Sequence, residues 1–189
     1  MPRLFVAVSL PAATTAELAL RQPPPMAGVR LVEPSQMHLT LYFIGEADIE
    51  RMGAALQAVA APAFLLTIEG VGQFSSAGRT VTLWARVRDN AQLLGLHAAV
   101  AVALAGEGFR SETRRYTPHI TLARCAPKVP AAMVAEFLAR HAAFSLPGVP
   151  VAEFSLYSST FVGDTSVYRR ERSFPLLVVG PAGSANCNN

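Results

Sequence analysis

The sequence has little of several residue types that mark common classes of protein. Its two cysteines, Cys125 and Cys187, lie far apart in the chain, so they form neither a disulfide framework nor a CxxC metal motif. Its one lysine, Lys128, leaves arginine to supply nearly all of the positive charge. Charged residues make up only 15% of the chain and hydrophobic residues 51%, which excludes an intrinsically disordered protein. The sequence therefore encodes a folded protein with a hydrophobic core.

Long hydrophobic runs are also missing. The longest, Leu93 to Ala105, contains His97 and falls short of the ~20 residues that a bilayer-spanning helix needs. The first residues resemble a secretion signal only faintly, because Ser9 and Pro11 interrupt the apolar run. We therefore expect a cytoplasmic protein with no membrane partner and no obligate protein partner.

The positive charge is modest. A net charge of +3 is small beside that of strong nucleic-acid binders, and the abundance of arginine fits a coding bias toward GC-rich codons as well as it fits phosphate recognition. Arg110, Arg114 and Arg115 are candidates for a rim that attracts RNA phosphates, and the alternative is a solvated loop. Charge alone therefore decides no function.

Hydrophobic periodicity and turn residues predict an α+β chain. Thr14 and Thr15 are expected to cap a first helix that runs to about Gln22, and Asp48 and Asn90 are expected to cap two later helices. The later helices are expected at 49–60, 91–105 and about 130–141. The predicted strands are 3–10, 28–32, 37–44, 64–70, 80–87, 117–123, 154–158 and 167–177.

The most informative feature is a pattern that occurs twice. Met37-His38-Leu39-Thr40-Leu41 and Pro118-His119-Ile120-Thr121-Leu122 share the order His, aliphatic, Thr, Leu, and about half of the chain separates them. A repeat at half-length predicts two related lobes, each an antiparallel sheet with helices, that face each other across a central cleft. We expect one bilobal domain over 1–180 and a flexible tail over 181–189.

On a strand, the His and Thr of each motif project to one side and the aliphatic residues project to the other. If both motifs face one cleft, the cleft receives two imidazoles and two hydroxyls. One imidazole can act as a base and the other as an acid near neutral pH, while the hydroxyls donate to phosphate oxygens. This set suits displacement at a phosphodiester and needs neither metal nor cofactor.

Two other histidines and one arginine lie outside the repeated pattern. His97 and His141 lack a threonine two residues later and are expected to be structural. Arg124 lies five residues after His119, so regular alternation places it on the opposite face unless the strand ends or bulges near Ala123.

Aromatic residues near the motifs are candidates for base stacking, although each is individually more typical of core; they are Tyr42, Phe43, Phe74 and Tyr116.

Other chemistries find no support. The sequence has no GxSxG elbow, no P-loop, and no GxGxxG after a strand. The two histidine motifs also lack the neighbouring His, Cys or carboxylate ligands that a zinc site requires.

Five segments, in this order, resemble the 2H phosphoesterase superfamily: RLFVAVSLP, MHLTLYFIG, RTVTLWARV, RYTPHITLAR and SLYSST with YRRERSFPL. Within it they are most similar to the RNA 2′,3′-cyclic phosphodiesterases, also called 2′-5′ RNA ligases. The resemblance covers about Arg3 to Leu177.

This resemblance implies a pseudo-twofold bilobal fold and metal-independent hydrolysis of an RNA or nucleotide 2′,3′-cyclic phosphate to a 2′-phosphomonoester. It implies His38 and His119 as the acid and base, Thr40 and Thr121 as phosphate ligands, and Arg124 as a further phosphate ligand. Which histidine is the acid stays open, although the resemblance favours His38. Two alternatives also stay open: 2′-5′ RNA ligation as the main direction, and a nucleotide-binding module without catalysis.

Overall fold

The computed structural model describes residues 1–75, 80–109, 115–163 and 165–178. These residues form four α-helices, nine β-strands and one short 3-10 helix at Pro34–Gln36. The helices are α1 (Ala12–Ala19), α2 (Ile49–Leu56), α3 (Ala91–Ala105) and α4 (Ala131–Arg140). The strands are β1 (Arg3–Ser9), β2 (Val29–Leu31), β3 (His38–Glu46), β4 (Phe64–Phe74), β5 (Val81–Val87), β6 (His119–Cys125), β7 (Ser145–Val151), β8 (Glu153–Val162) and β9 (Thr165–Pro175).

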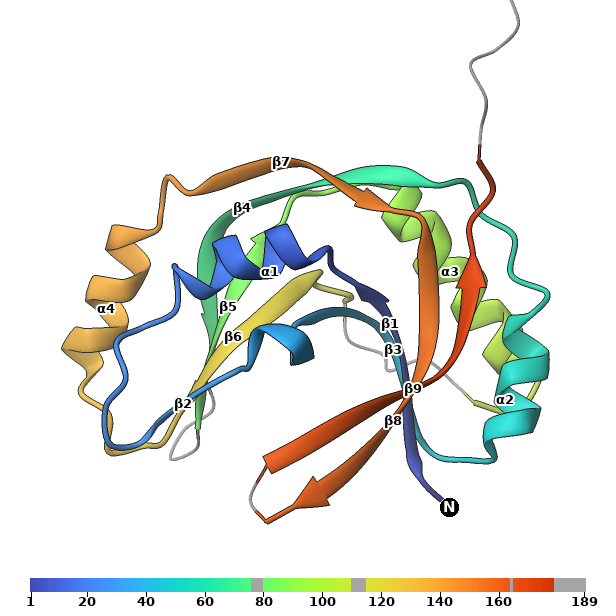
Figure 1. Ribbon diagram of the computed structural model, residues 1–189, viewed down its shortest axis with the longest axis horizontal. Coiled ribbons are helices and arrows are strands. Elements are labelled where there is room, and N and C mark those ends of the chain that lie inside the picture. Colours follow the sequence, from blue (N-terminus) through green and yellow to red (C-terminus); the bar gives the residue numbers. More distant parts are fainter. Residues whose placement is uncertain (76–79, 110–114, 164, 179–189) are drawn as a thin grey trace, which may run out of the picture.

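The strands form one open sheet with the order β7-β4-β5-β6-β3-β1-β8-β9, and β2 pairs with β6 beside this path. Figure 1 shows that the β8–β9 hairpin extends away from the arch formed by β4 and β7, and that α4 and α2 lie at opposite ends of the molecule. The expected α+β fold with antiparallel strands is therefore confirmed. The two expected sheets are the two halves of this sheet, one built on β3 and one on β6.

Among the described residues, the strand pairing between the two halves consists of one pair, Leu39 of β3 with Ile120 of β6. Strands from both ends of the chain build the half that contains β3, because β1 pairs with β3 on one edge and with β8 on the other. The β6 half takes its strands from the middle of the chain, where β5 pairs with β6 and with β4. The sequence repeat thus becomes two halves that interleave along the chain.

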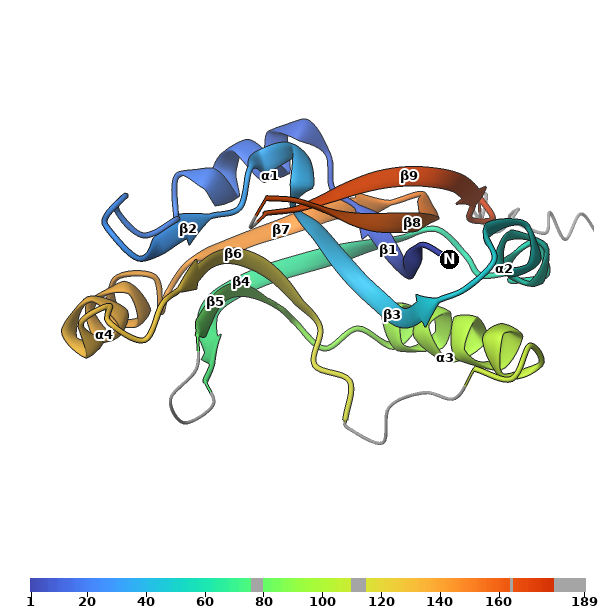
Figure 2. The same ribbon diagram turned by 90° about the horizontal axis from the view of Figure 1, so that it is seen from below.

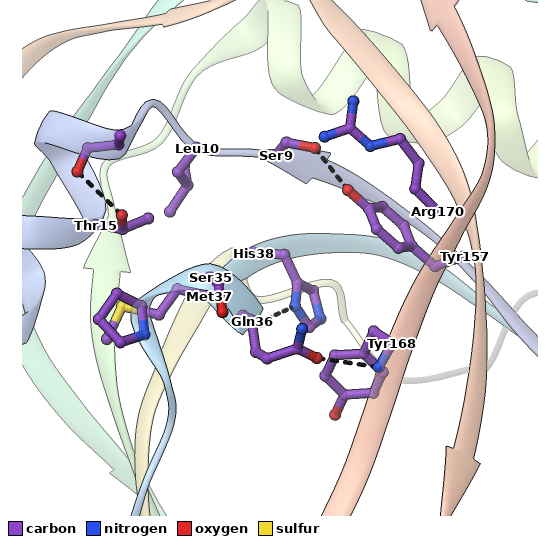
Figure 3. Close-up of a pocket in the computed structure, with 12 residues that line it drawn as sticks. Ser9, Leu10, Thr15, Ser35, Gln36, Met37, His38, Tyr157, Tyr168 and Arg170 are labelled. Carbon is purple, nitrogen blue, oxygen red and sulfur yellow. Dashed lines mark hydrogen bonds between the residues drawn. The ribbon is translucent and has the colours of Figure 1, made fainter.

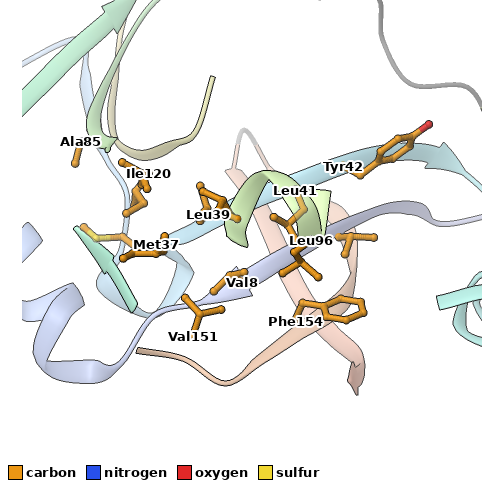
Figure 4. Packing of buried hydrophobic residues seen from close by; sticks show 14 of the residues in the cluster. Val8, Met37, Leu39, Leu41, Tyr42, Ala85, Leu96, Ile120, Val151 and Phe154 are labelled. Atoms are coloured by element: carbon orange, nitrogen blue, oxygen red, sulfur yellow. The ribbon is translucent and has the colours of Figure 1, made fainter. Parts of the chain in front are cut away.

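The hydrophobic core lies on the face of β3 and β6 that carries the aliphatic residues of both motifs. Leu39, Leu41, Ile120 and Leu122 are all buried, as expected from strand alternation. Helix α3 lies along β3 (Figure 2) and contributes four buried side chains at helical spacing. Figure 4 shows Leu96 of α3 next to Leu39 and Leu41. Each fully buried leucine contributes roughly 1.5–3 kcal/mol, so this packing holds both motif strands in place.

Helix boundaries agree with the sequence where a side chain caps the helix. The Asp48 side chain accepts a hydrogen bond from the Arg51 amide at 2.8 Å, and that of Asn90 accepts from the Leu93 amide at 2.9 Å. The expected cap at Thr14 and Thr15 is wrong, because α1 begins at Ala12 after Pro11 and both threonines are buried within it. Pro11 can precede the first turn because the first helical amides need no partner within the helix.

Strand β7 has no counterpart in the predicted elements. Its sequence, SLPGVPV, contains two prolines and a glycine, which normally argue against a strand. Because β7 is the last strand on its side of the sheet, its prolines need not donate to a neighbour on the open edge. The tail expected over 181–189 lies outside the described residues, and the domain limits stay a prediction.

Candidate active site

The two motifs line one cleft. The single pair between β3 and β6, Leu39 with Ile120, places His38 and Thr40 on one strand next to His119 and Thr121 on the other. All four polar side chains line a cavity of about 890 Å³, on the face opposite the buried aliphatic residues. The structure therefore brings together the two imidazoles and two hydroxyls that the sequence repeat indicated.

Both imidazoles are held in the same way. The Nδ1 atom of His38 lies 2.7 Å from the carbonyl oxygen of Gln36, and Nδ1 of His119 lies 2.7 Å from that of Thr117. In each motif this carbonyl belongs to the residue two positions before the histidine. A carbonyl can only accept, so Nδ1 carries the proton and donates it, which leaves Nε2 of each ring for chemistry in the cleft.

The surroundings of both rings lower their affinity for a proton. Burial is the largest cause that lowers the pKa of His38 and of His119 below the ordinary imidazole value. The hydrogen bonds to the Gln36 and Thr117 carbonyls act in the opposite direction and stabilise the charged rings. The positive charge of Arg124 lowers the pKa of both histidines further, so its guanidinium acts on both rings at once.

Aromatic side chains pack around each imidazole. The ring of Tyr168 meets the His38 ring edge-on at 5.0 Å, and Phe5 lies 5.0 Å from it on another side. On the second motif, Phe74 meets the His119 ring edge-on at 4.8 Å, and Trp84 lies 5.9 Å away. These contacts restrict ring rotation and account for the desolvation that lowers both pKa values.

A smaller cavity of about 230 Å³ lies beside His38 and shares Gln36 and Tyr168 with the main cleft. Figure 3 shows the His38 ring and Gln36 at this cavity, where the Gln36 side chain accepts a hydrogen bond from the Tyr168 amide at 3.0 Å. On its far side, the Ser9 and Tyr157 hydroxyls lie 2.6 Å apart. The Gln36 bond thus connects the 3-10 helix before β3 to β9, and the Ser9–Tyr157 contact connects β1 to β8 beside the segment that carries His38.

Arg124 reaches the cleft through a β-bulge. Opposite β5, Thr121 pairs with Trp84 and Ala123 pairs with Leu83, so Leu122 is an extra residue without a partner on β5. The bulge reverses the alternation, and Arg124 is exposed on the same face as Thr121 and lines the cleft. The irregular strand that a role for Arg124 requires is therefore present, although it lies within β6 rather than at its end.

The first motif contains the same bulge. Opposite β1, Thr40 pairs with Ala7 and Tyr42 pairs with Val6, so Leu41 is the extra residue. Both bulges fall three residues after the histidine, and the residue five positions after it then faces the cleft. In the first motif this residue is Phe43, which lines the cleft and is 67% exposed. The sequence analysis allowed for a bulge near Ala123 but not for one in β3, although the position of Phe43, which matches that of Arg124, could have suggested it.

The other candidate aromatic residues divide between surface and core. Phe74 is 40% exposed and lines the cleft, and Phe161 of β8, which the sequence analysis did not single out, is 65% exposed and lines it too. Tyr42 is buried in the core and does not line the cleft. Phe43, Phe74 and Phe161 are therefore the exposed phenylalanines that could stack on a base.

Tyr116 connects the segment that leads into the second motif with the strand of the first motif. Its hydroxyl donates a hydrogen bond of 2.9 Å to the carbonyl oxygen of Thr40, although it belongs to the segment before β6. Its ring stacks on His97 of α3, with the centroids 4.1 Å apart. His97 therefore has a structural role, as expected, and Tyr116 adds a link between the halves next to their single strand pair.

Of the three arginines that were candidates for a rim attracting RNA phosphates, the structure describes one. Arg110 and Arg114 lie outside the described residues, and Arg115 is exposed. Cys125 is buried with a free thiol.

In the described ranges, no group of three or more His, Cys, Asp or Glu side chains could hold a metal ion. None of the described helices is long and apolar enough to cross a membrane.

Comparison with known proteins shows which family this chain is similar to. A family model described as the 2′-5′ RNA ligase superfamily matches residues 12–160. The RNA 2′,3′-cyclic phosphodiesterase of Escherichia coli is 32% identical over 173 residues, which cover 88% of this chain and 92% of the relative. That of Archaeoglobus fulgidus is 29% identical over 177 residues, which cover 91% of this chain and 99% of the relative.

Solved structures show the same fold. E. coli LigT complexed with 3′-AMP superimposes with a TM-score of 0.71 at 28% identity, over 93% of this chain and 98% of that one. The TT0787 protein of Thermus thermophilus superimposes with a TM-score of 0.69 at 26% identity, over 92% of this chain and 97% of that one.

Proposed function

Because the chain belongs to the 2′-5′ RNA ligase superfamily, within the 2H phosphoesterases, we propose that it hydrolyses the 2′,3′-cyclic phosphate of an RNA end or nucleotide to a 2′-phosphomonoester. The observation that carries the proposal is the matched pair of imidazoles in one cleft, each anchored through Nδ1 and each accompanied by a threonine. The relatives from E. coli and A. fulgidus support it, because both are RNA 2′,3′-cyclic phosphodiesterases by name.

The reaction needs two proton transfers, and the cleft provides one imidazole for each. A neutral imidazole takes a proton from water as the water oxygen bonds to phosphorus. The second imidazole, protonated, gives its proton to the ribose O3′ as the bond between phosphorus and O3′ breaks. Following the family pattern, we assign the second role to His38 and the first to His119. The protons balance, because the base ends charged and the acid ends neutral.

The charge that develops on phosphate is matched by donors in the same cleft. We assign Thr40 and Thr121 to the two non-bridging oxygens, because each hydroxyl lies on the face of its neighbouring histidine. Arg124 adds a guanidinium whose planar fork can hold two oxygens at once. A solved relative that binds 3′-AMP is consistent with a nucleoside phosphate in this cleft.

Hydrolysis of 2′,3′-cyclic AMP in excess EDTA tests the proposal. The product is resolved by phosphorus NMR, and we expect a 2′-phosphate formed at the same rate with and without the chelator. A 3′-phosphate would mean that the other ester bond breaks. Unchanged substrate would indicate a nucleotide-binding module, and activity that EDTA abolishes and zinc or manganese restores would overturn the two-histidine mechanism.

A further inference from the structure

Two arginines face each other across neighbouring strands. In the pairing of β2 with β6, Arg30 is directly opposite Arg124. On the other edge of β6, Thr82 of β5 is also directly opposite Arg124. Directly opposite residues of antiparallel strands project to the same face, with Cβ atoms about 4.5–5.5 Å apart. Arg30, Arg124 and Thr82 therefore form one row across three strands, which we call the arginine row.

The arginine row belongs to the cleft but lies beyond the histidine motifs. All three of its side chains line the same cavity as His38 and His119. Of the two arginines, Arg124 lies on the strand that also carries His119 and Thr121, so it is the one nearer to the reacting phosphate. Because Leu122 is bulged, Arg124 lies only about two strand steps, or roughly 7 Å, from Thr121 along β6. The row therefore extends the site away from the reacting phosphate.

The arginine row places two like charges on directly opposite residues of neighbouring strands. Like charges directly opposite each other destabilise a sheet, and β2 is only three residues long. Among the described residues that line the cleft, the charged side chains apart from the histidines are Arg3, Arg30 and Arg124, with Glu33 as the carboxylate. This surplus of positive charge in a concave site attracts an anion, and two neighbouring guanidiniums can donate to it together.

We propose that Arg30, together with Arg124, binds a second phosphate: the one that joins the terminal nucleotide to the preceding nucleotide of an RNA strand. The inference rests on the proposed function, because the first phosphate must occupy the space between the histidines. A guanidinium has five N–H donors, so Arg124 can contact both phosphates while Arg30 contacts the second alone. The cleft then prefers an RNA end to a cyclic mononucleotide.

Two substrates that differ by one nucleotide test the proposal. They are 2′,3′-cyclic AMP and the adenosine dinucleotide that ends in a 2′,3′-cyclic phosphate. For the unmodified protein we expect a higher kcat/KM on the dinucleotide. Arg30→Ala should reduce the ratio of the two kcat/KM values about tenfold, through KM for the dinucleotide, as expected for the loss of a charge-assisted hydrogen bond. Arg30→Gln retains length and polarity and should show the same loss.

A matched control and a salt titration sharpen the result. Arg140→Ala removes an exposed arginine of α4 that pairs with Glu136 outside the cleft, and should retain the ratio of the unmodified protein. For the dinucleotide, the slope of log kcat/KM against log salt should become shallower by about 0.7 in Arg30→Ala, the value for one single-strand phosphate contact. Melting curves confirm that each variant is folded.

The outcomes separate the inference from the function on which it rests. If the unmodified protein opens both substrates with equal kcat/KM, or if Arg30→Ala lowers both values equally, Arg30 does not read a second phosphate and the inference is wrong. If the unmodified protein opens neither substrate, the proposed function itself fails.

Discussion

The two halves of the cleft share their backbone but differ in the side chains that the shared backbone presents. Both motif strands carry a bulge three residues after the histidine, and both then turn the fifth residue into the cleft. In the β3 half this residue is Phe43, which pairs with Phe5. In the β6 half it is Arg124, which pairs with Thr82 and Arg30. At this position one end of the cleft presents an aromatic ring and the other presents a guanidinium. We name the aromatic end and the cationic end after these two residues, although Arg3 also lines the cleft in the first half and Phe74 in the second.

This difference indicates how a symmetric scaffold can bind an asymmetric substrate. Two equivalent imidazoles supply one acid and one base, which is the part of the chemistry that benefits from symmetry. A nucleotide has a flat apolar base and a charged phosphate, and these need different partners. We infer that Phe43 and Arg124, at equivalent positions, orient the substrate so that the two histidines take different roles.

The largest expected effect comes from removing what the halves share. His38→Ala and His119→Ala should each lower kcat on 2′,3′-cyclic AMP by roughly 10²–10⁴-fold, the usual contribution of one acid-base catalyst. Because both groups serve one transition state, the double variant should lose less than the product of the two single losses. Strictly multiplicative losses would argue against a shared site.

The next effect concerns the cationic end. Arg124→Lys retains the charge but loses the planar fork that holds two oxygens, so kcat/KM should fall roughly 10–100-fold. The measurement is steady-state kinetics together with the affinity for 2′-AMP. Arg140→Lys, outside the cleft, is the matched control. Unchanged affinity for 2′-AMP in Arg124→Ala would show that Arg124 does not bind phosphate.

The aromatic end should respond differently. Phe43→Ala removes an exposed ring that can stack on a base, so KM should rise about tenfold with a smaller change in kcat. Phe43→Tyr retains the ring and should retain KM. If Phe43→Ala lowers kcat and leaves KM unchanged, the ring acts on the chemistry rather than on binding, and the comparison of the two ends is wrong.

A smaller effect should follow from loosening the contact between the halves. Tyr116→Phe retains the stack on His97 but removes the hydrogen bond to the Thr40 carbonyl, so kcat should fall about 3–10-fold while KM changes little. Tyr42→Phe is the control, because the buried Tyr42 hydroxyl has no hydrogen-bond partner among the described residues. Equal losses of kcat in both variants would show that Tyr116 has no specific role in positioning Thr40.

The smallest effect is a shift in pH dependence. A lowered pKa means that an imidazole retains its proton only at lower pH, so the bell-shaped profile of kcat/KM should have its maximum below about pH 6.5. Arg124→Gln removes a positive charge that disfavours both imidazolium ions. Both limbs of the profile should then move to higher pH. A shift to lower pH would contradict the proximity of Arg124 to both rings.

Local chemistry along the chain was enough to predict the elements with clear periodicity and the residues with distinctive spacing. Helix α3 begins and ends at the predicted residues, because Asn90 caps it and its apolar spacing is regular. The alternation of His38 with Leu39, and of His119 with Ile120, correctly assigned one face to the cleft and the other to the core. These features depend on neighbours within a few residues, which a sequence displays directly.

Contacts between distant segments decided the rest. Strand β7 contains prolines that only an edge position tolerates, and its position depends on β4. Arg124 and Phe43 reach the cleft because bulges form where β6 meets β5 and where β3 meets β1, and a bulge is a mismatch between two strands that neither strand encodes alone. The pairing of Arg30 with Arg124 likewise exists only after segments more than ninety residues apart have come together. Residue types thus set the available chemistry, and long-range strand register decided which side chains meet.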